Sequence, residues 1–282
     1  MYKLILENAK GEQLELTNNP AYTISSIDGL YPPSSTVNTS AAANIDGARF
    51  NSSRVNVRNI VIELAIESPA EENRINLYKY IKTKQKVKLY YSNDVRDVWI
   101  EGYVESMPIQ IFDIKQKTQI SILCPSPYFK NTKDNIIEFA TVESNFEFAF
   151  DIAEEGIAFS ELILQGEKSI INGGDAPNGA IIELIATGQV LNPKIYNVDT
   201  QEHYFLNVEM QSGDKITINT IRGEKSVTLL RNGAESNLIQ YMEVGSSWFQ
   251  LSPGDNIFTF TADEFPENLT CIFNQIDLFE GV

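Results

Sequence analysis

The sequence is 282 residues long, with 43% hydrophobic and 21% charged residues, a balance typical of a folded globular protein rather than a disordered chain. At about 150 residues per domain, this length predicts two domains, each large enough to bury a core of its own. No apolar run approaches the ~18 residues that a membrane-spanning helix needs, and residues 1–8 become polar too early for an export signal. We therefore expect a protein that is made in the cytosol and does not insert into a membrane.

Charge is distributed unevenly along the chain. Residues 1–133 contain 16 Lys and Arg against 14 Asp and Glu, whereas residues 134–282 contain 6 against 24. This step coincides with two prolines at residues 124–129 and with the polar segment 130–135, which together predict a boundary between domains 1–133 and 134–282. The acidic second half should repel phosphate backbones, which argues against nucleic-acid binding there.

The segment 30–48 is rich in small and polar residues. It is longer than loops usually are inside a compact domain. Two interpretations remain open: a surface loop, or an arm or hairpin that becomes ordered against a neighbouring subunit. For the second interpretation, the candidate contact residues are the larger apolar side chains in and beside the segment: Tyr31, Pro33, Val37, Ile45 and Phe50.

A strand and a helix are predicted next. Residues 59–67 are rich in β-branched side chains and predict a mostly buried strand. Ser68 is a suitable N-cap, Pro69 suits the first helical position, and Glu71 would complete a capping box. The helix is expected to run to about residue 83. Its buried face is expected to carry three apolar side chains: Ile75, Tyr78 and Ile81.

The remaining elements are predicted to be strands, so the fold class is mainly β with one helix in the first domain. In the first half they are expected at residues 86–91, 98–107 and 117–124, with 109–114 pairing with one of them. In the second half, short strands with turns about every 8–12 residues predict an antiparallel β-sandwich or jelly roll. These strands are expected at residues 135–142, 146–150, 181–184, 194–197, 204–208, 215–219, 226–231, 256–261 and 271–277.

The sequence offers little for catalysis or metal binding. His203 is the single histidine, so neither a histidine-based triad nor a His-rich metal site can form, and the cysteines make no Cys-x-x-Cys pair. Cys124 and Cys271 are expected to be buried small hydrophobic residues. The turn at residues 172–175 lacks the spacing of a calcium loop, and the acidic pair at 154–155 is interpreted as a solvated face. We expect no enzymatic activity, no cofactor and no metal.

One binding function stays open on these grounds. An acidic β-sandwich with exposed aromatic side chains is a common sugar-binding scaffold, because aromatic faces stack on pyranose rings. Trp99 and the pair Trp248 and Phe249 are the candidates, although their apolar neighbours favour core packing. The alternative function is therefore a carbohydrate-binding adhesion module that recognises a cell-wall glycan.

Several sequence blocks, taken together and in order, resemble one protein family. In the first half they lie at residues 46–50, 58–66, 69–83, 98–104 and 124–129, the last reading Cys-Pro-Ser-Pro-Tyr-Phe. In the second half they lie at residues 213–220, 227–233 and 248–256. Their order resembles the siphovirus-type distal tail proteins of phages and prophages, mainly of Gram-positive hosts.

This resemblance implies a structural role in a virion. Such proteins form a hexameric ring at the distal end of the tail tube, with a central channel for DNA as passing cargo. The first domain would be tail-tube-like and ring-forming, and the second a galectin-like β-sandwich that faces outward. The implied partners are further copies of the chain, the tail tube protein, a tail-associated hub or lysin protein, and a receptor-binding protein.

Overall fold

The computed structural model describes residues 2–41, 43, 46–139, 142–143, 161–162 and 166–282, which fall into two units. Unit 1 comprises Met1–Thr132 and Leu278–Val282, and unit 2 comprises Lys133–Asp277. The sequence prediction had extended the second domain to residue 282. The difference arises because Leu278 and Phe279 pair with Lys130 and Phe129 of unit 1.

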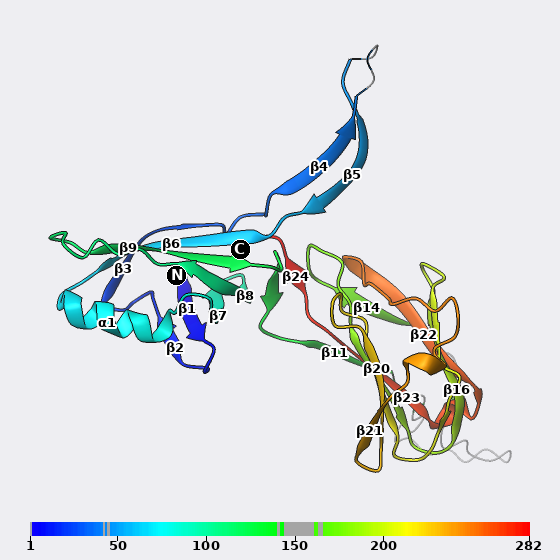
Figure 1. Ribbon diagram of the computed structural model, residues 1–282. Coiled ribbons are helices and arrows are strands. Elements are labelled where there is room, and N and C mark those ends of the chain that lie inside the picture. The colour runs from blue at the N-terminus through cyan, green and yellow to red at the C-terminus, as the bar shows by residue number, and fades with distance from the viewer. Residues whose placement is uncertain (1, 42, 44–45, 140–141, 144–160, 163–165) are drawn as a thin grey trace, which may run out of the picture. The chain divides into compact units, whose positions relative to one another are not determined.

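Unit 1 is built around an antiparallel sheet with the strand order β2-β1-β7-β8-β9-β6-β3 (Figure 1). Laid flat, these strands would separate β2 from β3 by ~29 Å at ~4.8 Å per strand. The connection from Glu15 to Tyr22 can span at most ~24 Å even when fully extended. The sheet must therefore curl until its two edges approach each other. Its strands are β1 (Lys3–Asn8), β2 (Gln13–Glu15), β3 (Tyr22–Asp28), β6 (Arg58–Ile66), β7 (Lys86–Ser92), β8 (Asp97–Ser106) and β9 (Lys117–Cys124).

Two further strand pairs belong to unit 1. The short strand β10 (Phe129–Asn131) pairs with β8 and with β24 (Leu278–Phe279), so the C-terminal end of the chain extends the sheet. Strands β4 (Ser35–Ser40) and β5 (Arg49–Val55) pair only with each other. The core of unit 1 is built mainly from alternate residues of the sheet strands. Representative fully buried members are Leu4, Leu6, Ile60, Ile62 and Ile120.

Helix α1 (Ala70–Tyr80) is the single α-helix in the described part of the chain, and it differs from the prediction in its start and in its buried face. Pro69 rather than Ser68 is the N-cap, the Ser68–Pro69 peptide bond is cis, and no side-chain capping bond forms. Glu71 instead accepts a hydrogen bond from Gln116 and pairs with Arg74, so the predicted capping box was wrong.

The predicted helical face was also wrong in part. Ile75 and Tyr78 are exposed, whereas Leu77 is fully buried and Ile81, which follows the helix as its C-cap, is 3% exposed. The side chains that anchor the helix, Leu77 and Ile81, are therefore four residues apart. The predicted three-residue spacing placed Ile75 and Tyr78 on the buried face, although both lie on the solvent side. The hydroxyl of Tyr22 on β3 donates to the carbonyl oxygen of Asn73 at 2.9 Å, which ties the helix to the edge of the sheet.

The segment 109–114 was predicted to pair as a strand, and this was wrong for most of it. Only Ile109 forms an isolated bridge, with Thr118, and the rest is an exposed turn between β8 and β9. The three strands predicted around it, 86–91, 98–107 and 117–124, are confirmed within one residue at each end.

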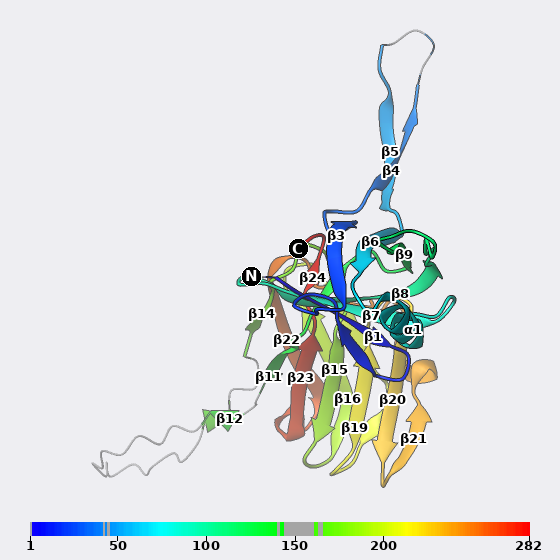
Figure 2. The same cartoon turned by 90° about the vertical axis from the view of Figure 1, so that its left-hand side faces the viewer.

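Unit 2 is an antiparallel sandwich, as predicted (Figure 2). One sheet has the order β11-β23-β15-β19-β20-β21, and the other has β14-β22-β16-β17, with β18 beside β16. Rings from the two sheets meet in the middle, with Phe258 and Phe273 centroids 4.9 Å apart. The strands are β11 (Asn135–Phe139), β14 (Lys168–Asn172), β15 (Ile181–Ala186), β16 (Val190–Asn197), β17 (His203–Phe205), β18 (Glu209–Met210), β19 (Lys215–Asn219), β20 (Ser226–Arg231), β21 (Ala234–Asn237), β22 (Gly254–Glu264) and β23 (Leu269–Gln275).

Small elements complete unit 2. Strands β12 (Val142–Glu143) and β13 (Glu161–Leu162) pair with each other, and two short 3-10 helices lie at Ile239–Tyr241 and Pro266–Asn268. The predicted strand at 146–150 and the acidic pair at 154–155 lie outside the described residues. Strands β13, β14, β18 and β21 were not predicted.

The two cysteines are free and buried, as the sequence predicted. Burial raises the pKa of the Cys124 thiol to about 12, and it also raises that of Cys271. Both side chains therefore act as small apolar core groups rather than as reactive thiols.

Candidate assembly surface

Strands β4 and β5 form a hairpin arm that projects from the sheet of unit 1 (Figures 1 and 2). Every described residue between Ser34 and Arg54 is exposed, on both faces of the hairpin. An isolated two-stranded hairpin is at best marginally stable in water, because it buries almost no apolar surface. The segment forms a hairpin, and its contact with a neighbouring subunit stays a prediction.

The register of the arm separates its side chains into two kinds of face. Val37 pairs with Ser53 and Thr39 pairs with Phe50, so the exposed apolar side chains Val37 and Phe50 share one face. The other face is polar, because Thr36 pairs with Arg54 and Asn38 pairs with Ser52. On that face the Asn38 amide donates to the Ser52 hydroxyl at 3.1 Å. The hairpin is therefore amphipathic although neither face is covered.

The structure brings together only part of the predicted contact set. Val37 and Phe50 lie on the apolar face of the arm, with exposed fractions of 54% and 59%. Tyr31 is exposed and Pro33 is half-buried, and both lie at the root of the arm. Ile45 lies outside the described residues. Tyr31 is close to Asp28, whose carboxylate raises the pKa of the tyrosine hydroxyl through a hydrogen bond.

Arg58, at the start of β6, fixes the root of the arm. It is 3% exposed, and burial lowers the pKa of its guanidinium. Its donors reach carbonyl oxygens of four separate residues: Gly29 at 2.5 Å, Tyr31 at 2.7 Å, Pro127 at 2.6 Å and Glu280 at 2.5 Å. Its guanidinium also lies 4.6 Å from the centre of the Phe129 ring. A single side chain thus ties together the segment between β3 and the arm, the segment after β9 and the C-terminal segment.

At the same point of the chain, Gly29 leaves no room for a side chain. Gly29 has a φ of +85°, and a Cβ atom there would lie 2.2 Å from the carbonyl oxygen of Asn59. The amide of Val282 donates to the carbonyl of Leu30 at 3.1 Å. The C-terminal residues therefore support the arm directly. Sequence reasoning missed Arg58, because an arginine at a predicted strand start is usually interpreted as solvent-exposed.

A second exposed apolar segment lies in the turn between β8 and β9. Phe112 and Ile114 are fully exposed and Ile111 is 43% exposed. The base of this turn is held by Gln116, whose amide donates to the carbonyl of Ile111 and to the Glu71 carboxylate. Sequence reasoning had assigned these residues to a paired strand, because their apolar character resembles that of a core segment.

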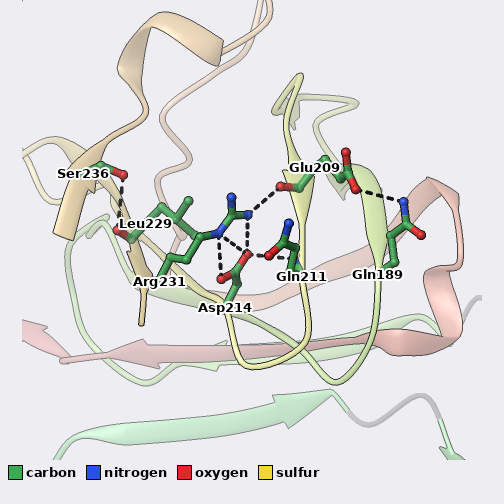
Figure 3. Close-up of polar contacts among 7 residues, drawn as sticks. All are labelled: Gln189, Glu209, Gln211, Asp214, Leu229, Arg231 and Ser236. Atoms are coloured by element: carbon green, nitrogen blue, oxygen red, sulfur yellow. Dashed lines mark hydrogen bonds and ion pairs between the residues drawn. The ribbon is translucent and has the colours of Figure 1, made fainter. Parts of the chain in front are cut away.

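In unit 2, Asp214 and Arg231 form a clamp; they belong to the blocks 213–220 and 227–233 that resemble the family (Figure 3). The carboxylate of Asp214, which is 2% exposed, accepts bonds from Arg231 Nε at 3.0 Å and Nη2 at 2.5 Å. The backbone N–H of Gln211 donates to the same carboxylate. Arg231 also donates to the backbone carbonyl of Glu209 at 2.9 Å. These bonds lower the pKa of Asp214 and raise that of Arg231. The clamp joins the turn before β19 to the end of β20, so these blocks serve the fold.

The two tryptophans named as sugar-binding candidates do not form an open stacking surface. Trp248 is half-buried and packs edge-on against Tyr204, with ring centroids 5.4 Å apart. Trp99 is half-buried in unit 1, where the ammonium groups of Lys88 and Lys130 lie about its ring at 4.9 and 5.1 Å. Both rings are occupied by neighbours from their own unit.

Comparison with the profiles of known protein families identifies the family of this chain. Residues 9–124 match the profile described as phage tail protein RIFT-related domain, and residues 173–275 match siphovirus-type tail component, C-terminal domain. The chain belongs to the siphovirus-type distal tail protein family. Members of this family are structural components of phage tails, and this chain has the same role at the tail tip.

Solved structures share the fold over the full length of the chain. The Dit protein of phage SPP1, described as a hub of the adsorption apparatus in phages that infect Gram-positive bacteria, matches with a TM-score of 0.69 at 12% identity, covering 98% of this chain and 99% of that one. A chain of the phage P2 baseplate in its activated conformation with Ca matches with a TM-score of 0.58 at 10% identity, covering both chains fully. Curated protein sequences give no match. The family and these folds confirm the predicted mainly β fold class.

The described residues contain no helix that is both long and apolar enough to cross a membrane. Within the same residues, His, Cys, Asp and Glu side chains form no group of three or more that could hold a metal ion.

Proposed function

We propose that the protein forms a hexameric ring at the distal end of a phage tail tube and leaves a central channel through which DNA passes. In this proposal unit 1 builds the ring, and unit 2 faces outward and anchors other baseplate proteins. The family relationship supports a structural role at the tail tip. The partners are further copies of the chain, the tail tube protein, a tail-associated hub or lysin protein and a receptor-binding protein.

The observation that carries the ring proposal is the hairpin arm. A closed ring needs heterologous contacts, in which one surface of a subunit meets a different surface of the next. The arm extends beyond the body of unit 1, and its apolar face exposes Val37 and Phe50. Burial of this face against a neighbouring subunit would remove the exposed apolar surface and stabilise the hairpin at the same time.

The experiment compares the two faces of the arm. Val37→Ser together with Phe50→Ser removes the apolar face, and Asn38→Ser together with Arg54→Ser is a matched change on the polar face. Oligomeric mass by light scattering is the readout, and circular dichroism checks that both variants fold. We expect the apolar-face variant to lose the ring and the polar-face variant to keep it.

The proposal fails if the apolar-face variant still assembles like the unchanged protein. A folded protein with the arm replaced by a short Gly-Ser link gives the same test in a stronger form. Rings formed without any arm would show that the subunits meet elsewhere.

The structural role also leads us to propose that the protein acts without catalysis. Digestion of host cell walls by the purified protein, measured by zymography, would contradict this part of the proposal.

A further inference from the structure

The outer face of one sheet of unit 2 carries a cluster of half-exposed rings. In β16 and β17 the residues alternate between buried and half-exposed, so Lys194, Tyr196, His203 and Phe205 all face away from the core. The register places Tyr196 opposite His203 and Lys194 opposite Phe205. The four side chains therefore occupy adjacent positions on neighbouring strands.

The rings contact one another without being covered. The Tyr196 and Phe205 centroids lie 5.0 Å apart in an edge-to-face arrangement, and those of His203 and Phe205 lie 4.3 Å apart. The Lys194 ammonium lies 5.4 Å from the centre of the Phe205 ring. These contacts hold the rings in place on a β-sheet, which is a rigid support, so that aromatic surface remains in water in one preorganised arrangement.

Polar groups surround this aromatic surface, and some of them have no partner. Lys194 pairs with Asp263, whose carboxylate also accepts a bond from the Asn192 amide at 3.0 Å. Within the described residues, neither the Tyr196 hydroxyl nor a ring nitrogen of His203 forms a hydrogen bond to another protein group. A half-exposed ring surface with free donors and acceptors at its margin can stack on an apolar face and hydrogen-bond hydroxyl groups in one encounter.

We propose that this surface, made of Lys194, Tyr196, His203, Phe205 and Asp263, binds a neutral saccharide. One face of a pyranose ring presents C–H groups, which fit against an aromatic ring, and its edge presents hydroxyl groups, which fit the free Tyr196 and His203 atoms. Charge excludes the main alternative. Residues 134–282 contain 24 acidic against 6 basic residues, so a phosphate-rich or sulfated polymer would be repelled. Lys194 does not offset this, because Asp263 already neutralises it.

The test measures saccharide binding to the full-length protein by titration calorimetry and ligand-detected NMR. The probes are lactose, cellotriose and triacetylchitotriose, with heparin as a polyanionic control. We expect at least one neutral probe to bind with a Kd tighter than about 10 mM. Tyr196→Ala should weaken that binding at least tenfold. Phe205→Leu should do the same while it preserves apolar burial, which keeps the test valid if larger truncations unfold the sheet.

A control is Ile136→Ala, because Ile136 is an exposed apolar residue on β11, in the other sheet of unit 2, and it should leave binding unchanged. The proposal is overturned if no neutral probe binds, if heparin alone binds, or if Tyr196→Ala binds as well as the unchanged protein. The arm variant Val37→Ser with Phe50→Ser should still bind saccharide. Loss of rings and loss of saccharide binding can therefore be distinguished, and neither proposal depends on the other.

Discussion

Replacing Arg58 with Met should destabilise unit 1 while leaving unit 2 intact. The substitution preserves much of the side-chain length and removes the charged donors, so the carbonyl oxygens of Gly29, Tyr31 and Pro127 lose their partner. The carbonyl of Glu280 loses its partner as well. The root of the arm and the C-terminal segment would then no longer be joined.

The size of the effect follows from opposing terms. Hydrogen bonds to a charged group contribute about 1.5–3 kcal/mol each, so bonds to four carbonyl groups total roughly 6–12 kcal/mol before costs. Removing the guanidinium from water opposes this by several kcal/mol, and water can reach some of the exposed carbonyl groups in the variant. The net loss of unfolding free energy should be about 3–5 kcal/mol.

The two tryptophans provide an assay for each unit separately, because Trp99 lies in unit 1 and Trp248 lies in unit 2. In a Trp248→Phe background, urea unfolding followed by Trp99 fluorescence reports unit 1 alone. With a slope of about 2 kcal/mol per molar urea, Arg58→Met should lower the midpoint by about 2 M. Arg54→Met, an exposed arginine on the arm, is the control and should change stability by less than about 0.5 kcal/mol. A loss below about 1 kcal/mol for Arg58→Met would refute this account of the root.

Three further outcomes follow from the same structure. Deletion of residues 278–282 should lower the stability of unit 1 by about 2–4 kcal/mol in the Trp99 assay and leave the Trp248 signal of unit 2 unchanged, because the segment pairs with β10 and supports Arg58. Gly29→Ala should cost more than about 2 kcal/mol by thermal melting, since its positive φ and the 2.2 Å approach to a carbonyl oxygen both oppose a Cβ atom. The pKa of Asp214 lies below its ordinary 3.8 in the folded protein, so its contribution is present above that pH and disappears as pH falls through the folded pKa. Asp214→Asn should cost about 2 kcal/mol at pH 7 and flatten the acid dependence of unit 2 stability, and an unaltered acid profile would contradict this.

The strands of this fold could be predicted because they depend on local alternation. Residues 215–219 and 226–229 alternate buried and half-buried positions, residues 117–124 are mostly buried, and the three observed strands have the predicted bounds. Strand β21 was missed because every residue of Ala234–Asn237 is exposed, so it carries no apolar pattern to detect. Its pairing with β20 follows a tight turn rather than a hydrophobic signal.

The helix shows where local rules were insufficient. Ser68 and Glu71 satisfy the sequence pattern of a capping box. The Glu71 carboxylate instead accepts a hydrogen bond from the side chain of Gln116, which lies 45 residues further along the chain. A tertiary hydrogen bond of this kind leaves no local trace in the sequence. The same applies to Arg58, whose partners come from residues that are distant in sequence.

The position of the candidate assembly surface in the sequence could be predicted, but the pairing of its strands could not. The composition of residues 30–48 indicated a segment outside the core, and Val37 of this segment shares a face of the observed hairpin with Phe50, which lies just beyond it. Composition could not supply the cross-strand register that decides which side chains share a face. The aromatic surface at Tyr196 and Phe205 was missed for the same reason, because it forms between strands.

The central claim is a ring of six copies at the tail tip. Native mass spectrometry and negative-stain imaging of the full-length protein, mixed with the tail tube protein that it is proposed to cap, test this claim most directly. The account predicts complexes with six copies of this chain and a central hole. A different copy number, or a closed assembly without a channel, would contradict it.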